Sequence, residues 1–219
     1  QNNELAKKID KNNANKDIFI DIIQRRINYF NNSSNDEWKI EKNEDNFTDP
    51  IFLIGFPRSG TTLLDTILRS HPKIDVLEEK PIVDKFIEKL HQKTLSKFEN
   101  LNSPTSSLRN EMRKFYFDQR NKYLINKKKS IIIDKMPLNI IYVAEIFRFF
   151  PKAKFILAIR NPYDCVLSCF MQNFLLNNAM SNFLNINDSA KMYNMVMNLW
   201  QIYTKKFSID FHTIKYEEL

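Results

Sequence analysis

The sequence predicts an α/β protein in which helices flank a mostly parallel central sheet in three layers. Short apolar runs recur along the 219-residue chain, and such runs are typical of strands buried on both faces. Longer segments with a helical spacing of apolar residues separate these runs. Strands that alternate with helices pair in parallel, and ligand loops then lie at the carboxyl ends of the strands.

The composition fits a globular domain. Hydrophobic residues make up 43% of the chain and charged residues 27%, which are ordinary values. A chain of this length buries enough surface to fold without disulfides. Its only cysteines, Cys165 and Cys169, lie four apart on one predicted helix and are expected to pack as small hydrophobic side chains. No run reaches the roughly 18 apolar residues of a membrane-spanning helix.

Residues 1–49 are predicted to precede the main domain as a tail, a helix and a linker. Residues 1–15 are rich in Asn and Lys, and a polar stretch of this kind is typical of a tail. Apolar residues at helical spacing predict a helix over 17–30, followed by a polar linker at 31–49. The chain begins without Met or a signal-like apolar segment, so we expect an excised piece. One interpretation of the helix is the end of a helical-repeat region.

The first half of the main domain, which spans residues 50–219, is predicted to alternate strands and helices. An apolar run bounded by Pro50 and Gly55 indicates a buried first strand. Pro72 marks the end of the following helix, because a residue before proline avoids helical geometry. In chain order, we expect a strand at 51–54, a helix at 61–70, a short strand at 74–77, and helices at 81–98 and 106–125.

The second half continues the alternation. Pro137 and Pro162 stand where a helix tolerates proline, in its first turn, and Asn161 is a suitable N-cap for the second of these helices. The expected strands lie at 130–134, 154–159 and 211–216, and the expected helices at 137–150, from 162 onward and at 188–207.

The two glycines of the chain, Gly55 and Gly60, lie five apart in a single loop. A protein so poor in glycine keeps it where no Cβ fits. The segment 55–62, called the phosphate loop below, leaves a strand and opens a helix, which directs backbone N–H groups at one anion. It nearly matches the G-x-x-x-x-G-K-[ST] pattern, but Thr61 replaces the Lys and Arg58 supplies positive charge instead. The expected fold is therefore P-loop-like.

At these residues the sequence resembles sulfotransferases that use 3′-phosphoadenosine 5′-phosphosulfate (PAPS). The segment 57–64, Pro-Arg-Ser-Gly-Thr-Thr-Leu-Leu, is similar to their 5′-phosphosulfate loop. The similarity covers about residues 50–219 in order, and is closest to tyrosylprotein sulfotransferases and to bacterial domains that follow tetratricopeptide repeats. Further matching blocks are His71-Pro72, Glu78-Glu79, residues 134–139 and 150–154, Arg160-Asn161-Pro162 with Ser168, and residues 216–219.

The resemblance implies a nucleotide site with 3′,5′-ADP as the product. In the family, an Arg and a Ser matching Arg160 and Ser168 hold the 3′-phosphate, and the Tyr matching Tyr216 lies beside the nucleotide. The family normally continues with segments that cover the 3′-phosphate, so truncation at the C-terminus is expected. The cofactor-binding residues implied are Arg58, Ser59, Gly60, Thr61, Thr62, Arg160, Ser168 and Tyr216.

The resemblance also implies the catalytic residues. Glu79 matches the general base of the tyrosylprotein enzymes, with Glu78 as the near rival. Lys135 and Arg58 match groups that act on the sulfonate and the bridging oxygen. The loop without Lys and the lack of a convincing acidic metal site indicate chemistry without a metal. Pro81 replaces an Arg of the tyrosylprotein enzymes, so the acceptor stays open among a peptide tyrosine, a carbohydrate and a small alcohol.

Two other functions compete with this one. The phosphate loop alone would allow a P-loop kinase or nucleotidase. The net charge of +7 would allow a non-catalytic module that binds nucleotides or nucleic acid. The basic runs at 25–26 and 127–129 lack interleaved aromatic residues, so we expect no nucleic-acid partner. We expect a cytoplasmic, bacterial-type enzyme without a membrane segment, and a homodimer stays open.

Overall fold

A computed structural model of the chain describes residues 14–34, 38, 45–124 and 129–219. Most of the tail predicted at 1–15 and much of the linker predicted at 31–49 lie outside the described residues. The helix predicted at 106–125 ends earlier, at Asn121, and its predicted last residue, Ile125, lies outside the described residues. Two of the three lysines at 127–129 also lie outside them.

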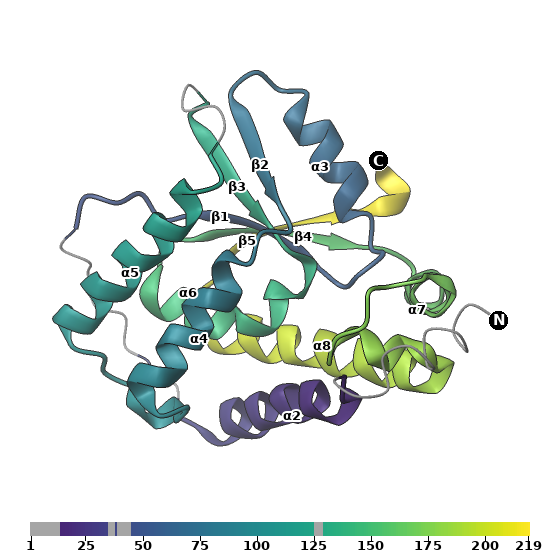
Figure 1. The fold of residues 1–219 in the computed structure, drawn as a ribbon, viewed down its shortest axis with the longest axis horizontal. Helices are drawn as coiled ribbons and strands as arrows, with labels where there is room; N and C mark the ends of the chain where they lie inside the picture. The colour runs from purple at the N-terminus through teal and green to yellow at the C-terminus, as the bar shows by residue number, and fades with distance from the viewer. Residues whose placement is uncertain (1–13, 35–37, 39–44, 125–128) are drawn as a thin grey trace.

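The centre of the fold is a five-stranded sheet in which every neighbouring pair of strands is parallel (Figure 1). The predicted parallel α/β sheet is thus confirmed. Strand β1 lies in the middle, and the strand order is β2-β3-β1-β4-β5. The chain therefore crosses to opposite sides of β1, which places a topological switch point at its carboxyl end. The strands are β1 (Ile51–Gly55), β2 (Ile74–Glu78), β3 (Ile131–Lys135), β4 (Lys154–Ile159) and β5 (Asp210–Lys215).

Helices cover the two faces of the sheet unequally (Figure 1). Leu53 of β1 belongs to a small apolar cluster that includes Leu64 of α3 (Thr61–Arg69). The neighbouring side chain, Phe52, points to the opposite face and joins the large core, because successive strand residues alternate between faces. The helices on that side are α4 (Ile82–Thr94), α5 (Ser106–Asn121), α6 (Val143–Phe149), α7 (Pro162–Met171) and α8 (Ile186–Lys206).

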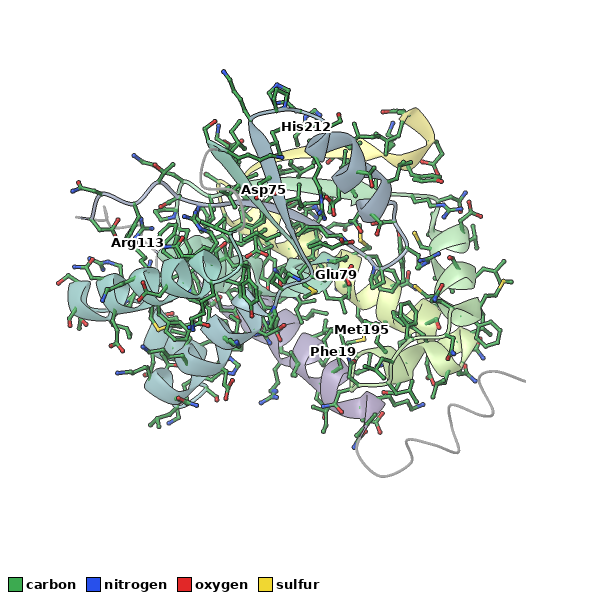
Figure 2. All side chains as sticks on the ribbon, turned by 45° about the horizontal axis from the view of Figure 1, so that its top comes forward. Phe19, Asp75, Glu79, Arg113, Met195 and His212 are labelled. Carbon is green, nitrogen blue, oxygen red and sulfur yellow. The ribbon has the colours of Figure 1, made fainter. Side chains whose placement is uncertain are left out.

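The N-terminal helix α2 (Lys16–Asn32) packs against α8. Figure 2 labels Phe19 of α2 and Met195 of α8, which belong to the same apolar cluster. Arg26 of α2 is 2% exposed and forms a 2.5 Å ion pair with the fully buried Glu145 of α6. In the described part of the chain, no helix is long and apolar enough to cross a membrane.

The helix predicted at 137–150 is wrong in its first half, which is a 3₁₀ helix, η3 (Pro137–Tyr142), before α6. The N–H of Asn139 donates to the carbonyl of Met136 at 3.0 Å, the three-residue spacing of a 3₁₀ turn. The helix predicted at 81–98 ends early because Leu95 has a left-handed backbone with φ 53°. The shorter 3₁₀ helices are η2 (Phe98–Leu101), η4 (Met180–Leu184) and η5 (Tyr216–Glu218).

Helix α8 begins two residues before the predicted position because its N-cap is Asn185, whose side chain accepts from two backbone N–H groups. The cap predicted for α7 is confirmed, since the Asn161 side chain accepts from the N–H of Tyr163 at 2.9 Å. The expected burial of Cys165 and Cys169 is also confirmed, with both at 0% exposure. Strand β5 ends at Lys215, one residue earlier than predicted.

Candidate functional site

The phosphate loop connects β1 to α3 in a compact turn that depends on both glycines. A Cβ at Gly55 would lie 2.6 Å from the carbonyl oxygen of Ala158. Gly60 has φ 94°, and a Cβ there would overlap the ring of Tyr216. The expectation that these glycines stand where no Cβ fits is therefore confirmed. Arg58 also has a left-handed backbone, with φ 68°, and a non-glycine residue in that region is strained.

Polar groups in and near this loop lack partners within the described structure. The buried hydroxyl of Ser59 has none, and neither has the buried Nε of Arg160. The N-cap of α3 is Gly60, which has no side chain to bond the first N–H groups of the helix. Buried polar groups normally have partners, and the donors at a helix N-terminus favour anions. These residues therefore fit a bound phosphate or sulfonate group.

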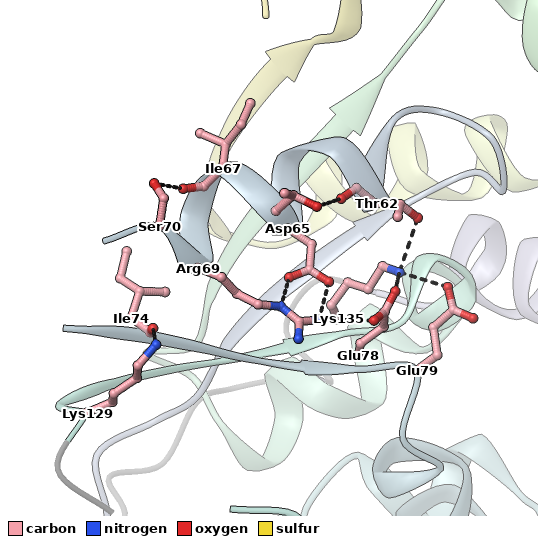
Figure 3. A network of polar contacts seen from close by, with 11 residues as sticks. Thr62, Asp65, Ile67, Arg69, Ser70, Ile74, Glu78, Glu79, Lys129 and Lys135 are labelled. Carbon is pink, nitrogen blue, oxygen red and sulfur yellow. Dashed lines mark hydrogen bonds and ion pairs between the residues drawn. The ribbon is translucent and has the colours of Figure 1, made fainter. Parts of the chain in front are cut away.

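Lys135 ends β3 at 0% exposure and holds the loop and two carboxylates together (Figure 3). Its Nζ lies 2.8 Å from Oε1 of Glu79, 3.3 Å from Oε1 of Glu78 and 3.5 Å from Oγ1 of Thr62. The parallel register pairs Glu78 of β2 with Lys135 of β3, which is why the cation and both acids meet at one strand edge.

The two adjacent glutamates have different surroundings. Glu78 bonds Arg69 at 3.1 Å as well as Lys135 (Figure 3). Burial raises the pKa of the Glu78 carboxyl, but Lys135 and Arg69 more than offset this, so its pKa lies below the ordinary value. Glu79 has φ 48°, and its N–H donates to the Lys135 carbonyl at 2.7 Å. This conformation directs Glu79 into the neighbouring cavity, near the centre of the view in Figure 2.

The residues predicted for the 3′-phosphate lie close to the loop. Nε of Arg58 donates to the hydroxyl of Ser168 on α7 at 3.0 Å. Arg160 follows β4, with its guanidinium 4.6 Å from the ring centroid of Tyr216 and 3.3 Å from Asp164. Arg58, Arg160 and Ser168 line a shared hollow of about 340 Å³. Tyr216 is the first residue of η5 rather than a strand residue.

A cavity of about 500 Å³ opens at the carboxyl edge of the sheet. Three predicted site residues do not line it: Ser59 is buried within the phosphate loop, Lys135 is buried behind Glu79, and Ser168 lines the adjoining hollow. The remaining predicted residues line the cavity together: Arg58, Gly60, Thr61, Thr62, Glu79, Arg160 and Tyr216.

Sequence reasoning missed two features of this region. Met136, Leu138, Phe174, Leu175 and Met180 form an apolar side of the same cavity, here named the apolar wall. The matching block at 134–139 contains Met136 and Leu138, but no motif marks residues 174–180, and the sequence does not show that the two segments meet.

The second feature is the buried Asp134. Its Oδ2 accepts from the Tyr116 hydroxyl at 2.9 Å while Oδ1 has no partner among the described residues. Burial raises its pKa to about 7.

The histidines lie away from this constellation. Figure 2 shows His212 on β5, well separated from Glu79. His91 lies on α4, and burial together with the charge of Arg26 lowers its pKa. Within the described ranges, no group of three or more His, Cys, Asp or Glu side chains is arranged to hold a metal ion.

The fold and the glycine-dependent loop after β1 together define a P-loop-like α/β protein. A sequence profile of the sulfotransferase family matches residues 50–219, and the chain belongs to that family. The resemblance that the sequence predicted is thus confirmed at the family level.

Three individual proteins are similar to this chain in sequence or in fold. The chain is 35% identical over 142 residues to an uncharacterized protein of Aquifex aeolicus (strain VF5), a match that covers 61% of this chain and 18% of that protein. The crystal structure of sulfotransferase STF9 from Mycobacterium avium superposes with a TM-score of 0.50 at 17% identity, covering 80% of this chain and 60% of that one. Sulfotransferase STF1 from Mycobacterium tuberculosis H37Rv gives 0.50 at 15% identity, with 90% and 68% covered. The chain therefore spans about a fifth of the Aquifex protein.

Proposed function

We propose that this protein transfers a sulfuryl group from PAPS to an acceptor hydroxyl, with Glu79 as the general base. The observation that carries the proposal is the position of Lys135, whose ammonium lies within 3.5 Å of both Thr62 in the phosphate loop and Glu79 at the cavity. One cation therefore links the anion-binding loop to a carboxylate that can receive a proton.

The donor side of the cavity suits a nucleotide with two anionic groups. The phosphate loop and the start of α3 would hold the 5′-phosphosulfate, and the partnerless hydroxyl of Ser59 would gain an acceptor there. Arg160 and Ser168 would hold the 3′-phosphate, because a guanidinium fork and a hydroxyl suit phosphate oxygens. Tyr216 beside Arg160 offers an aromatic surface to the nucleoside. PAPS, when bound, supplies the activated sulfuryl group.

Each charged side chain at the centre has a separate role in this proposal. Glu79 accepts the proton of the acceptor hydroxyl, while Glu78 is bonded to Arg69 and stays outside the cavity lining. Lys135 and Arg58 place positive charge beside the loop, where negative charge grows in the transition state. Preorganised charge of this kind is often the largest contribution to catalysis.

The test separates nucleotide binding from proton transfer. Replacing Arg160 by Ala should weaken 3′,5′-ADP binding, measured by calorimetry, by roughly 1.5–3 kcal/mol, because charge-assisted bonds to a phosphate are lost. Replacing Glu79 by Gln should leave that affinity unchanged and slow transfer of labelled sulfate from PAPS by roughly 10²–10⁴-fold. The matched control for Glu79→Gln is Glu78→Gln. The matched control for Arg160→Ala is Arg25→Ala, which removes a positive charge on the exposed side of α2.

Three results would count against the proposal. Tighter binding of ATP than of 3′,5′-ADP, dependent on Mg²⁺, would indicate a P-loop kinase. Normal 3′,5′-ADP binding by Arg160→Ala would remove the assignment of the 3′-phosphate site. Full turnover by Glu79→Gln would show that another residue is the general base. Slow transfer by Glu78→Gln would then identify Glu78 as that base.

A further inference from the structure

The cavity has two chemically different sides, and only one suits a nucleotide. Among the described lining residues, the charged side chains are those of Arg58, Arg160 and Glu79. Both arginines are tied to α7 and η5 through Ser168 and Tyr216, which places them on the nucleotide side. The other side is the apolar wall, which adjoins Glu79.

The apolar wall is anchored to the rest of the fold. The ring of Phe174 lies 5.2 Å from that of the buried Phe183, which in turn lies 5.7 Å from Phe56 of the phosphate loop. On the opposite side, Met136 and Leu138 flank the buried Pro137 at the start of η3. The ring of Phe174 is therefore held by packed rings, whereas Pro137 lines the cavity together with Met136 and Leu138, and Leu175 is 90% exposed.

Few free polar groups accompany this wall. The side-chain oxygen of Asn177 accepts from the N–H groups of both Ala179 and Met180, each at 2.9 Å, so it is committed within its own turn. Gln172 is the other amide in the lining. A carbohydrate carries many hydroxyls that need partners once buried, and this side supplies too few.

Charge argues against an acidic acceptor. Glu79 is the charged lining residue on this side of the cavity, and the described wall residues carry no cation. Lys135, which directly precedes Met136, is 0% exposed and already bonded to Glu78 and Glu79. An acidic peptide would meet a like charge on an apolar surface, which costs free energy without a compensating ion pair. An uncharged molecule with an apolar body would instead bury its surface against the wall.

We propose that the acceptor is an uncharged alcohol with an apolar body, whose hydroxyl meets Glu79 while its apolar part packs against the apolar wall. This inference rests on the proposed sulfuryl transfer and narrows its acceptor. In the transfer, the acceptor oxygen forms a bond to sulfur, the bond from sulfur to the phosphate oxygen of PAPS breaks, and the hydroxyl proton passes to Glu79. The products are a sulfate monoester and 3′,5′-ADP.

The experiment compares acceptors on the same protein. Transfer from PAPS is measured with 1-butanol, 1-hexanol and 1-octanol, with methyl glucoside, and with an acidic tyrosine-containing peptide. Binding of 1-octanol to the 3′,5′-ADP complex is followed separately by saturation-transfer NMR, which needs no turnover. We expect kcat/KM to rise about 2- to 4-fold for each added methylene, since burying one CH₂ fully is worth about 4-fold.

Two variants test the wall itself. Leu175 is 90% exposed, so Leu175→Lys should fold normally. The substitution should weaken the binding of 1-octanol by about 3-fold or more and raise the transfer to the acidic peptide. Leu95→Lys is the matched control, because Leu95 is 75% exposed on α4's C-terminal turn and does not line the cavity. Phe174→Ala should weaken the binding of 1-octanol more than Leu175→Lys does, while the affinity for 3′,5′-ADP stays unchanged.

The outcomes are distinguishable. Normal 3′,5′-ADP binding with kcat/KM that is flat across the alkanols, or higher for methyl glucoside or the peptide, would overturn the acceptor assignment and leave the proposed function standing. Equal effects of Leu175→Lys and Leu95→Lys on 1-octanol binding would also overturn it. Absence of 3′,5′-ADP binding would overturn the proposed function, and the acceptor assignment with it.

Discussion

The buried Asp134 predicts a measurable dependence of stability on pH. Asp134 is 1% exposed on β3, directly before Lys135, and burial raises its pKa from 3.8 to about 7. Between these values the unfolded chain ionises this carboxyl and the folded chain keeps it protonated. The contribution of Asp134 to the free energy of unfolding therefore falls as pH rises from about 4 to about 7, and it stays constant above pH 7. The difference of about three pH units corresponds to about 4 kcal/mol.

Replacing Asp134 by Asn removes the ionisation and keeps an oxygen that can accept from Tyr116. Urea denaturation at several pH values, followed by circular dichroism, gives the free energy of unfolding for both proteins. We expect the two to agree within about 1 kcal/mol at pH 4, and the variant to be more stable by about 4 kcal/mol at pH 8. Carboxylates with lowered pKa affect both proteins equally and cancel in the difference. A difference that stays constant from pH 4 to pH 8 would refute the reasoning.

Three further perturbations test other parts of the structure. Gly60→Ala should lower the free energy of unfolding by about 1–2 kcal/mol in urea denaturation, because a left-handed backbone costs a non-glycine residue that much; unchanged stability would contradict the loop geometry. Arg26→Met should lower the free energy of unfolding by roughly 3–5 kcal/mol by leaving Glu145 buried without its partner, and adding Glu145→Leu should restore most of it. Burial raises the pKa of Cys165 to about 11 and of Cys169 to about 12, so both should react with a thiol reagent at pH 8 at least about 100-fold more slowly than free cysteine.

The sequence was sufficient for the strands and for the phosphate loop because both signals are local. The apolar run between Pro50 and Gly55 marks β1, and the two glycines of the following loop mark positions where no Cβ fits. The N-cap at Asn161 was predicted for the same reason, since a capping side chain bonds within its own turn.

The contacts that assemble the site were not predictable in this way. The approach of Lys135 to both Glu78 and Glu79 depends on β2 and β3 being neighbours, and an apolar run does not encode strand order. The bond from Arg58 to Ser168 joins residues 110 positions apart. Burial of Asp134 was equally hidden, because an acid that follows three isoleucines is typical of a strand end exposed to solvent.

The placement of β1 at the centre of the sheet has a consequence for synthesis on the ribosome. Gly60 and Tyr216, which touch across the nucleotide side of the cavity, are 156 positions apart in the chain. The phosphate loop and α3 therefore leave the ribosome long before β5 can add itself beside β4. Until that strand docks, the proposed nucleotide site lacks one of its walls. A growing chain therefore completes the proposed site only after β5 has docked beside β4.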